Sequence, residues 1–214
     1  MKVIIQIVLW IAIVVLVYLN YKSIYGPVEF NKAKEKRYEQ VIKKLDNIRK
    51  AQLAHRDVIG KFTSSFDSLT RFIDTAEFTL TQRRDTSYLD KEYLKNYGVD
   101  KMVEDVVIDT LGKVKVKDSL FKNYDYSKLS SVPFTENAKF KIDAGYVNVN
   151  NNKVPVFEVK VNKSLVLDGL DPELIIQEKQ TISVDGVNGA YIKVGSMDEV
   201  DTSGNWPINY GKQE

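Results

Sequence analysis

The chain of 214 residues has no cysteine and a single histidine, His55. Without cysteine it can form neither disulfides nor thiolate-ligated zinc or iron–sulfur centres, and it has no thiol nucleophile. The nucleotide-binding loops GxxxxGK[ST] and GxGxxG are missing, as are the hydrolase motif GxSxG and the zinc-protease motif HExxH. A Ser-His-Asp site would depend wholly on His55. We therefore expect a protein that is not an enzyme and that uses no small-molecule cofactor.

Carboxylates are the remaining source of chemistry. Two acidic groups stand out, one at Asp168, Asp171 and Glu173 and the other at Asp198, Glu199 and Asp201. Neither has the spacing of an EF-hand, so we predict no metal site. A pair of acids facing one cleft would support a carboxylate-dependent hydrolase, which we keep as the third functional alternative.

Charge is nearly balanced, with 31 basic and 29 acidic side chains and a net charge of +2. That balance gives no overall field for nucleic acid, which we exclude as a partner. Residues 22–61 nevertheless hold eleven basic and five acidic side chains. This basic section could contact anionic lipid headgroups, or it could be a solvated helix face.

One long apolar run lies at the N-terminus. Val3–Leu19 contains no charge, and as a helix its seventeen residues would span roughly 25 Å, the short end of what crosses a bilayer. Tyr18, Tyr21 and Tyr25 follow at the expected membrane interface. The run ends without the small-residue pattern of a signal-peptide cleavage site. We therefore predict an uncleaved single-pass anchor over residues 1–25, with the lipid bilayer as its partner.

The orientation of this anchor is ambiguous from charge. Basic side chains follow the span at Lys22, Lys32, Lys34, Lys36 and Arg37, whereas only Lys2 and the α-amino group precede it. The positive-inside rule would place the large domain in the cytoplasm, but long domains translocate largely regardless of charge.

Gly26-Pro27 predicts a break between the anchor and a second helix, because proline lacks a donor and suits the first turn of a helix. Residues 26–60 are then expected to form an amphipathic stalk helix. Side chains at spacings of 3 and 4 form a seam typical of a coiled coil. The seam consists of Tyr38, Val41, Leu45, Ile48, Gln52, His55 and Ile59. It could dock on the chain's own distal domain or on a second copy or another protein.

Residues 61–195 predict an α+β domain with mainly antiparallel pairing, followed by a loop-like tail over 196–214. Residues 77–82 and 190–194 indicate strands, and 138–149 with 154–161 indicate a hairpin closed by a run of asparagines. Residues 106–117 indicate a second hairpin that turns at Gly112, although a helix over 100–111 also fits. Ser64 or Ser65 is expected to cap one short helix, and Asp171-Pro172 to begin another.

Aromatic residues gather in the middle of the chain. Tyr88, Tyr93, Tyr97, Tyr124 and Tyr126 fall within forty residues. They could form a stacking surface for a sugar polymer or a peptide, or serve as ordinary packing residues. A binding module for such a ligand is the second functional alternative.

The junction between helix and distal domain resembles that of type IV pilins and pseudopilins. The resemblance covers residues 3–70 and is carried by three stretches: Asp46-Asn47-Ile48-Arg49-Lys50-Ala51-Gln52, Gly60-Lys61-Phe62 and Phe66-Asp67-Ser68-Leu69. The processing signature of that family, a Gly followed by Phe-Thr-Leu-Ile-Glu, is absent. The resemblance implies a pilin-like arrangement of helix and head.

The whole chain also resembles a family of uncharacterised membrane-anchored proteins of the Bacteroidetes. Four stretches carry that resemblance: Ile108-Asp109-Thr110-Leu111-Gly112, Val116-Lys117-Asp118-Ser119-Leu120-Phe121, Val154-Pro155-Val156-Phe157-Glu158-Val159-Lys160 and Gly204-Asn205-Trp206-Pro207. The lineage implies O-glycosylation of extracytoplasmic proteins at Asp-Ser/Thr followed by a small or aliphatic residue. Asp67-Ser68-Leu69, Asp74-Thr75-Ala76, Asp109-Thr110-Leu111 and Asp118-Ser119-Leu120 match.

Together these patterns predict a non-enzymatic envelope protein. We expect it to lie in the inner (cytoplasmic) membrane with its distal domain in the periplasm. There it would serve as a structural, assembly or adaptor component that contacts a protein partner, or a second copy of itself, through the stalk.

Overall fold

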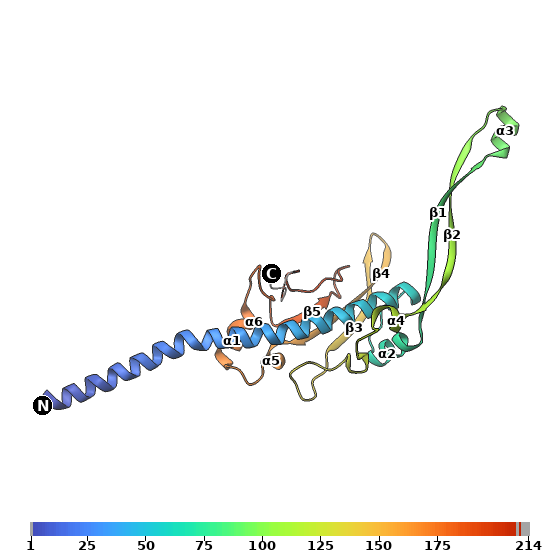
Figure 1. Cartoon of the computed structure of the whole chain (residues 1–214). Helices are drawn as coiled ribbons and strands as arrows, with labels where there is room; N and C mark the ends of the chain where they lie inside the picture. Colours follow the sequence, from blue (N-terminus) through green and yellow to red (C-terminus); the bar gives the residue numbers. More distant parts are fainter. Residues whose placement is uncertain (1, 209, 211–214) are drawn as a thin grey trace.

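The computed structural model describes residues 2–208 and residue 210, and the fold is α+β. The second half of the long N-terminal helix α1 (Lys2–Ile59) lies along the body, by which we mean the packed part of the chain that follows α1. The first half of α1 stands free of the body (Figure 1). The remaining elements follow in chain order: α2 (Phe66–Thr75), β1 (Glu77–Leu89), α3 (Lys91–Tyr97), β2 (Met102–Lys115), α4 (Val116–Leu120), η1 (Tyr126–Lys128), β3 (Lys141–Val149), β4 (Asn152–Asn162), α5 (Lys163–Val166), α6 (Pro172–Gln180) and β5 (Tyr191–Gly195).

Helix α1 is continuous over 58 residues, so the expected break at Gly26-Pro27 is wrong. A proline inside a helix removes one hydrogen bond, and its ring clashes with the carbonyl one turn earlier and with the Cβ and N–H of the residue before it. Gly26 has no Cβ, which removes part of that clash. The N-terminal part of α1 is long and apolar enough to cross a membrane and makes no contact that buries it, consistent with a single-pass membrane protein.

The second half of α1 packs against an antiparallel sheet of order β3-β4-β5. The hairpin of β3 and β4 is confirmed, with Val149 paired to Asn152. Asn150 and Asn151 form its turn at φ values of 49° and 65°, a left-handed conformation that asparagine tolerates well. Pro155 lies in the part of β4 that pairs with β3 alone, because β5 covers only Glu158–Asn162.

The second predicted hairpin is wrong. Strand β2 runs through Gly112 without turning and pairs along its whole length with β1. The register shifts between Leu80, opposite Gly112, and Thr81, opposite Thr110, so Leu111 is the extra residue of a β-bulge. Glycine inside a strand is compatible with either a tight turn or a bulge. The expected strand over 114–117 also ends early, because α4 begins at Val116.

Strands β1 and β2, with α3 at their tip, form a two-stranded arm over residues 77–115 that extends away from the body (Figure 1). The arm begins near the C-terminal end of α1, at the opposite end of the molecule from the N-terminus. Helix α3 was not expected from the sequence. It begins at a cap in which Asp90 accepts a hydrogen bond from Tyr93 N, and it ends at Gly98 with φ 67°.

Two predicted helix starts are confirmed. Ser65 caps α2 by accepting from Ser68 N, and Asp171 caps α6 by accepting from Glu173 N and Leu174 N. The predicted final strand is confirmed as β5. The core between α1, α2 and the sheet contains large buried side chains from each, among them Tyr38, Leu45, Phe157 and Ile192.

Candidate functional site

The seam predicted on the stalk lies inside the chain's own body. Six of its residues are buried, whereas Ile59 is 50% exposed. The six are Tyr38, Val41, Leu45, Ile48, Gln52 and His55. A coiled coil through these side chains would require the body to leave the helix.

The two polar residues of the seam, Gln52 and His55, hold the chain in place at the end of α1. Gln52 donates to Thr63 O at 2.6 Å and accepts from Thr63 N at 3.1 Å. His55 Nδ1 lies 2.6 Å from Lys61 O, and since a carbonyl only accepts, Nδ1 is the donor. Both side chains therefore hold the turn that returns the chain to the body. His55 also packs on Phe72, with ring centroids 4.9 Å apart.

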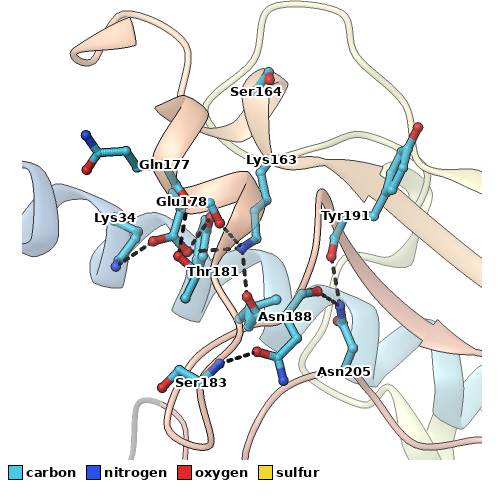
Figure 2. Close-up of polar contacts among 12 residues, drawn as sticks. Lys34, Lys163, Ser164, Gln177, Glu178, Thr181, Ser183, Asn188, Tyr191 and Asn205 are labelled. Atoms are coloured by element: carbon cyan, nitrogen blue, oxygen red, sulfur yellow. Dashed lines mark hydrogen bonds and ion pairs between the residues drawn. The ribbon is translucent and has the colours of Figure 1, made fainter. Parts of the chain in front are cut away.

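A buried lysine is the most unusual polar group in the body. Lys163, the first residue of α5, has no exposed surface. Its Nζ donates to Glu178 O at 2.7 Å and to Glu178 Oε1 at 3.1 Å (Figure 2). It also donates to Val187 O at 2.7 Å. These three contacts use all three donors of the ammonium group.

Glu178 connects this lysine to the stalk. Its Oε2 lies 3.0 Å from Lys34 Nζ (Figure 2). Tyr38 OH donates to Oε1 at 3.4 Å. Burial lowers the pKa of Lys163, and the hydrogen bond and charge of Glu178 oppose that shift. Burial, followed by the charge of Glu178, raises the pKa of Tyr38. The network therefore joins α1, α5, α6 and the loop after α6.

A lysine with a lowered pKa can act as a base or nucleophile, but only if a substrate can reach it. Lys163 is fully covered and all its donors are occupied. We therefore interpret the cluster as a structural network of hydrogen bonds and ion pairs that holds the stalk helix against the body. Sequence reasoning missed it because the ion pairs join residues 15 and 144 positions apart, and each charged member resembles an ordinary surface charge.

An open groove of about 840 Å³ runs beside the buried face of α1. One wall is a helix face between Glu39 and Lys50, and the other is formed by the C-terminal tail, with Tyr124 also contributing. Its apolar lining consists of Ile42, Tyr124, Trp206, Ile208 and Tyr210. The volume lies in the usual range for ligand pockets.

The tyrosines in the middle of the chain do not form one surface. Tyr88, Tyr93 and Tyr97 belong to the arm, and the last two stack on each other with centroids 4.6 Å apart. Tyr124 and Tyr126 instead belong to the body, where both pack on Phe121. Of the five, Tyr124 lines the groove.

The two groups of acidic residues noted in the sequence are not gathered into a cluster of ligands in the described part of the chain. Within residues 2–208 and 210, no cluster of three or more His, Asp or Glu side chains is arranged to hold an ion. Asp171 is occupied as a helix cap, and Asp201 accepts from Ser203 N at 2.8 Å and from Ser203 Oγ at 2.7 Å.

Comparison with known proteins gives no match. No protein-family model, curated protein or solved structure matches the chain. The resemblances to pilins and to the Bacteroidetes family therefore stay predictions.

The arm is the second surface available for contact. Among residues 2–208 and 210, its two strands pair only with each other, so each has one edge whose backbone groups have no strand partner there. Met102, Val106 and Ile108 lie on one face of β2, where they are 59%, 40% and 66% exposed, and Glu104 lies between the first two on the same face. Charged side chains flank this apolar stripe, with Arg83 opposite Ile108 and Asp85 opposite Val106.

Proposed function

We propose that the protein is a non-enzymatic, membrane-anchored adaptor of the cell envelope whose arm binds a protein partner. The observation that carries this proposal is the exposure of the arm on both faces and both edges. An isolated two-stranded hairpin is marginally stable in water. Natural proteins usually cover or shorten such edges, because an unpaired strand is a template for pairing with another chain.

The position of the arm supports the same function. From Leu19 to Ile59, α1 rises roughly 60 Å, so its far end stands well clear of the lipid headgroups. The arm adds a ribbon of roughly 43 Å from that end. A partner located away from the membrane surface is thus within reach of an anchored chain.

Photo-cross-linking in membranes tests the proposal. A photoreactive amino acid replaces Ile108 on the apolar stripe or, as a matched control, Leu165, which is 47% exposed on the body. We expect an adduct with another protein at position 108 and none at position 165. An absence of adducts at 108, or equal labelling at both positions, would contradict the proposal. An adduct of twice the chain's mass would instead identify the partner as a second copy.

We propose a periplasmic location for the body, with the anchor in the inner membrane. Two of the basic side chains after the span are engaged by the body: Lys34 binds Glu178, and Arg37 donates to the carbonyls of Val166 and Asp168. They are therefore weak evidence for a cytoplasmic orientation. The hydroxyl residues of the four expected glycosylation motifs (Ser68, Thr75, Thr110 and Ser119) are all exposed, as that modification requires.

A second candidate function is the binding of a sugar polymer or a peptide. The groove between α1 and the tail favours it, because three aromatic side chains and several polar ones line the same space. This function and the adaptor function use different surfaces and are compatible in one molecule.

A further inference from the structure

We propose that the groove between α1 and the C-terminal tail binds an uncharged oligosaccharide. This inference rests on the second candidate function, binding of a sugar polymer or a peptide, and is independent of what the arm contacts. It names both the site and the chemical class of the ligand.

The charges of the groove favour a neutral ligand. Five charged side chains line it, and each is in an ion pair with another of the five. Asp46 lies 2.8 Å from Arg49 and 3.0 Å from Lys50, and Glu39 pairs with Lys43. With three basic and two acidic side chains the lining has a net charge of only +1, which gives little attraction for a highly charged ligand, and sugar hydroxyls can donate to the carboxylates and accept from the cations.

The aromatic lining supplies flat apolar surfaces for a sugar ring. Trp206 lies against Gly204 so closely that a Cβ at position 204 would come within 2.4 Å of the indole ring. That contact fixes the indole at the tail wall of the groove. Tyr124 and Tyr210 present further rings, and Tyr210 is supported from below by Tyr38 with ring centroids 6.4 Å apart. The C–H face of a sugar packs on such rings, while its hydroxyls reach the polar side chains.

The backbone of the walls argues against an extended peptide. The helix wall has its N–H and C=O groups bonded within α1. In the tail wall, Ser203 O accepts from Gly195 N at 2.8 Å and Asn205 N donates to Lys193 O at 3.1 Å, so the tail already pairs with β5. A peptide bound as a strand takes much of its affinity from main-chain hydrogen bonds, and these walls offer few.

The length of the groove favours an oligomer over a single sugar. Its helix wall runs from Glu39 to Lys50, a rise of roughly 16 Å along α1. Polar groups are distributed along that length, with Asn47 near the middle and Ser203 on the opposite wall. Several rings of a linear glycan could therefore contact the groove at once.

Tryptophan fluorescence gives a direct test, since the chain has only two tryptophans, Trp10 in the anchor and Trp206 in the groove. The full chain carrying Trp10→Phe is held in detergent micelles and titrated with three probes. These are the tetramer of N-acetylglucosamine, the tetramer of glucose, and a neutral glycine-serine tetrapeptide. We expect a saturable change in Trp206 emission with at least one sugar, with a midpoint near or below about 1 mM, and none with the peptide.

Two further variants locate the binding. Tyr124→Ala removes one ring from the groove and is expected to weaken sugar binding about tenfold, corresponding to the loss of one aromatic contact. Tyr88→Ala, on the arm, is the matched control and should leave the midpoint unchanged.

Three results would overturn the inference. They are no response to either sugar up to about 10 mM, a sugar response that Tyr124→Ala does not alter, and binding of the peptide alone. The last result would replace the ligand class and keep the second candidate function. If none of the three probes binds, both the oligosaccharide inference and the second candidate function are wrong. The adaptor function would then still be tested separately by the cross-linking at Ile108.

Discussion

Lys163 and Glu178 show how two side chains can attach a domain to its anchor. A buried charge is tolerated only when it is paired and hydrogen-bonded, and each of these groups meets that condition through contacts with the other. Because Glu178 also binds Lys34 and Tyr38, the pair lies between the stalk and the membrane-proximal part of the body.

Lys163→Met should therefore destabilise the protein strongly. The substitution keeps an apolar stem of similar length but leaves Val187 O and Glu178 O without their donor. We expect the free energy of unfolding to fall by about 3 kcal/mol, as for other buried pairs that lose one partner. Chemical denaturation in detergent measures it, with the exposed Lys95→Met as the control. Equal stability of the two variants would show that the network does not stabilise the packing of the stalk helix on the body.

The buried tyrosines predict a loss of stability at alkaline pH. Burial raises the pKa of Tyr38 and of Tyr210 above the usual value of 10.0, so above pH 10 the unfolded chain loses these protons first. Stability is thus fully present below pH 10 and falls as pH rises, by up to about 1.4 kcal/mol per pH unit for each tyrosine.

Lys163 acts with the opposite sign. Its pKa lies below the usual 10.5, so the unfolded chain holds this proton longer and stability rises with pH up to that value. Between about pH 10.5 and 11.5 the tyrosines should therefore dominate. In that window the free energy of unfolding of the Tyr38→Phe variant should fall less steeply with pH than that of the unsubstituted chain. The difference in slope should be about 1.4 kcal/mol per pH unit, which corresponds to one proton. Parallel curves would mean that Tyr38 ionises as easily in the folded state as in the unfolded one.

The arm and the body have separate sources of stability. Of the arm's side chains, Phe78 at its base packs against the buried core, where it is paired with Val114 on the neighbouring strand. These two residues pair directly, so Asn-Gly can replace residues 79–113 between them as a two-residue turn. We expect this truncation to change the free energy of unfolding of the body by less than about 1 kcal/mol.

Leu45→Ala provides the comparison for the truncation. It removes a fully buried side chain from the core and should cost about 2–5 kcal/mol. Both variants are measured by chemical denaturation in the same detergent. A truncation as damaging as Leu45→Ala would mean that the arm is part of the cooperative unit.

The sequence predicts elements well where one residue determines a local geometry. Ser65 and Asp171 were recognisable as caps because each supplies an acceptor to the free N–H groups at a helix start. The asparagine turn at 150–151 follows in the same way from the left-handed conformation. Gly112 was misread because its partner strand, β1, begins 35 positions earlier, and only that pairing distinguishes a bulge from a turn.

The candidate sites were less predictable than the fold. The seam residues were recognised as apolar and helical, but which surface covers them depends on strands more than 100 positions away. Nothing local in the sequence indicates that Trp206 and Tyr124 lie across the same groove. Contacts at such separations depend on the whole topology rather than on periodicity.

At the scale of the whole molecule, the lack of cysteine allows a direct assay of orientation. Ser119→Cys places one thiol on an exposed residue of the body, and Leu45→Cys places one in the core. If the body is periplasmic, a membrane-impermeant maleimide should label the Ser119→Cys variant in spheroplasts without lysis. The Leu45→Cys variant should stay unlabelled until the protein is denatured. Labelling of the Ser119→Cys variant only after lysis would place the body in the cytoplasm.

Because α1 is continuous through Pro27, the anchor and the body are joined by one unbroken helix and move together. Membrane helices tilt by up to about 40°, and a hinge at Gly26-Pro27 would have absorbed such motion before it reached the body. With an unbroken helix, a tilt change of about 10° moves the far end of α1 sideways by roughly 10 Å. If the arm binds a partner as proposed, the thickness of the surrounding bilayer would help to set the positions that the arm can reach.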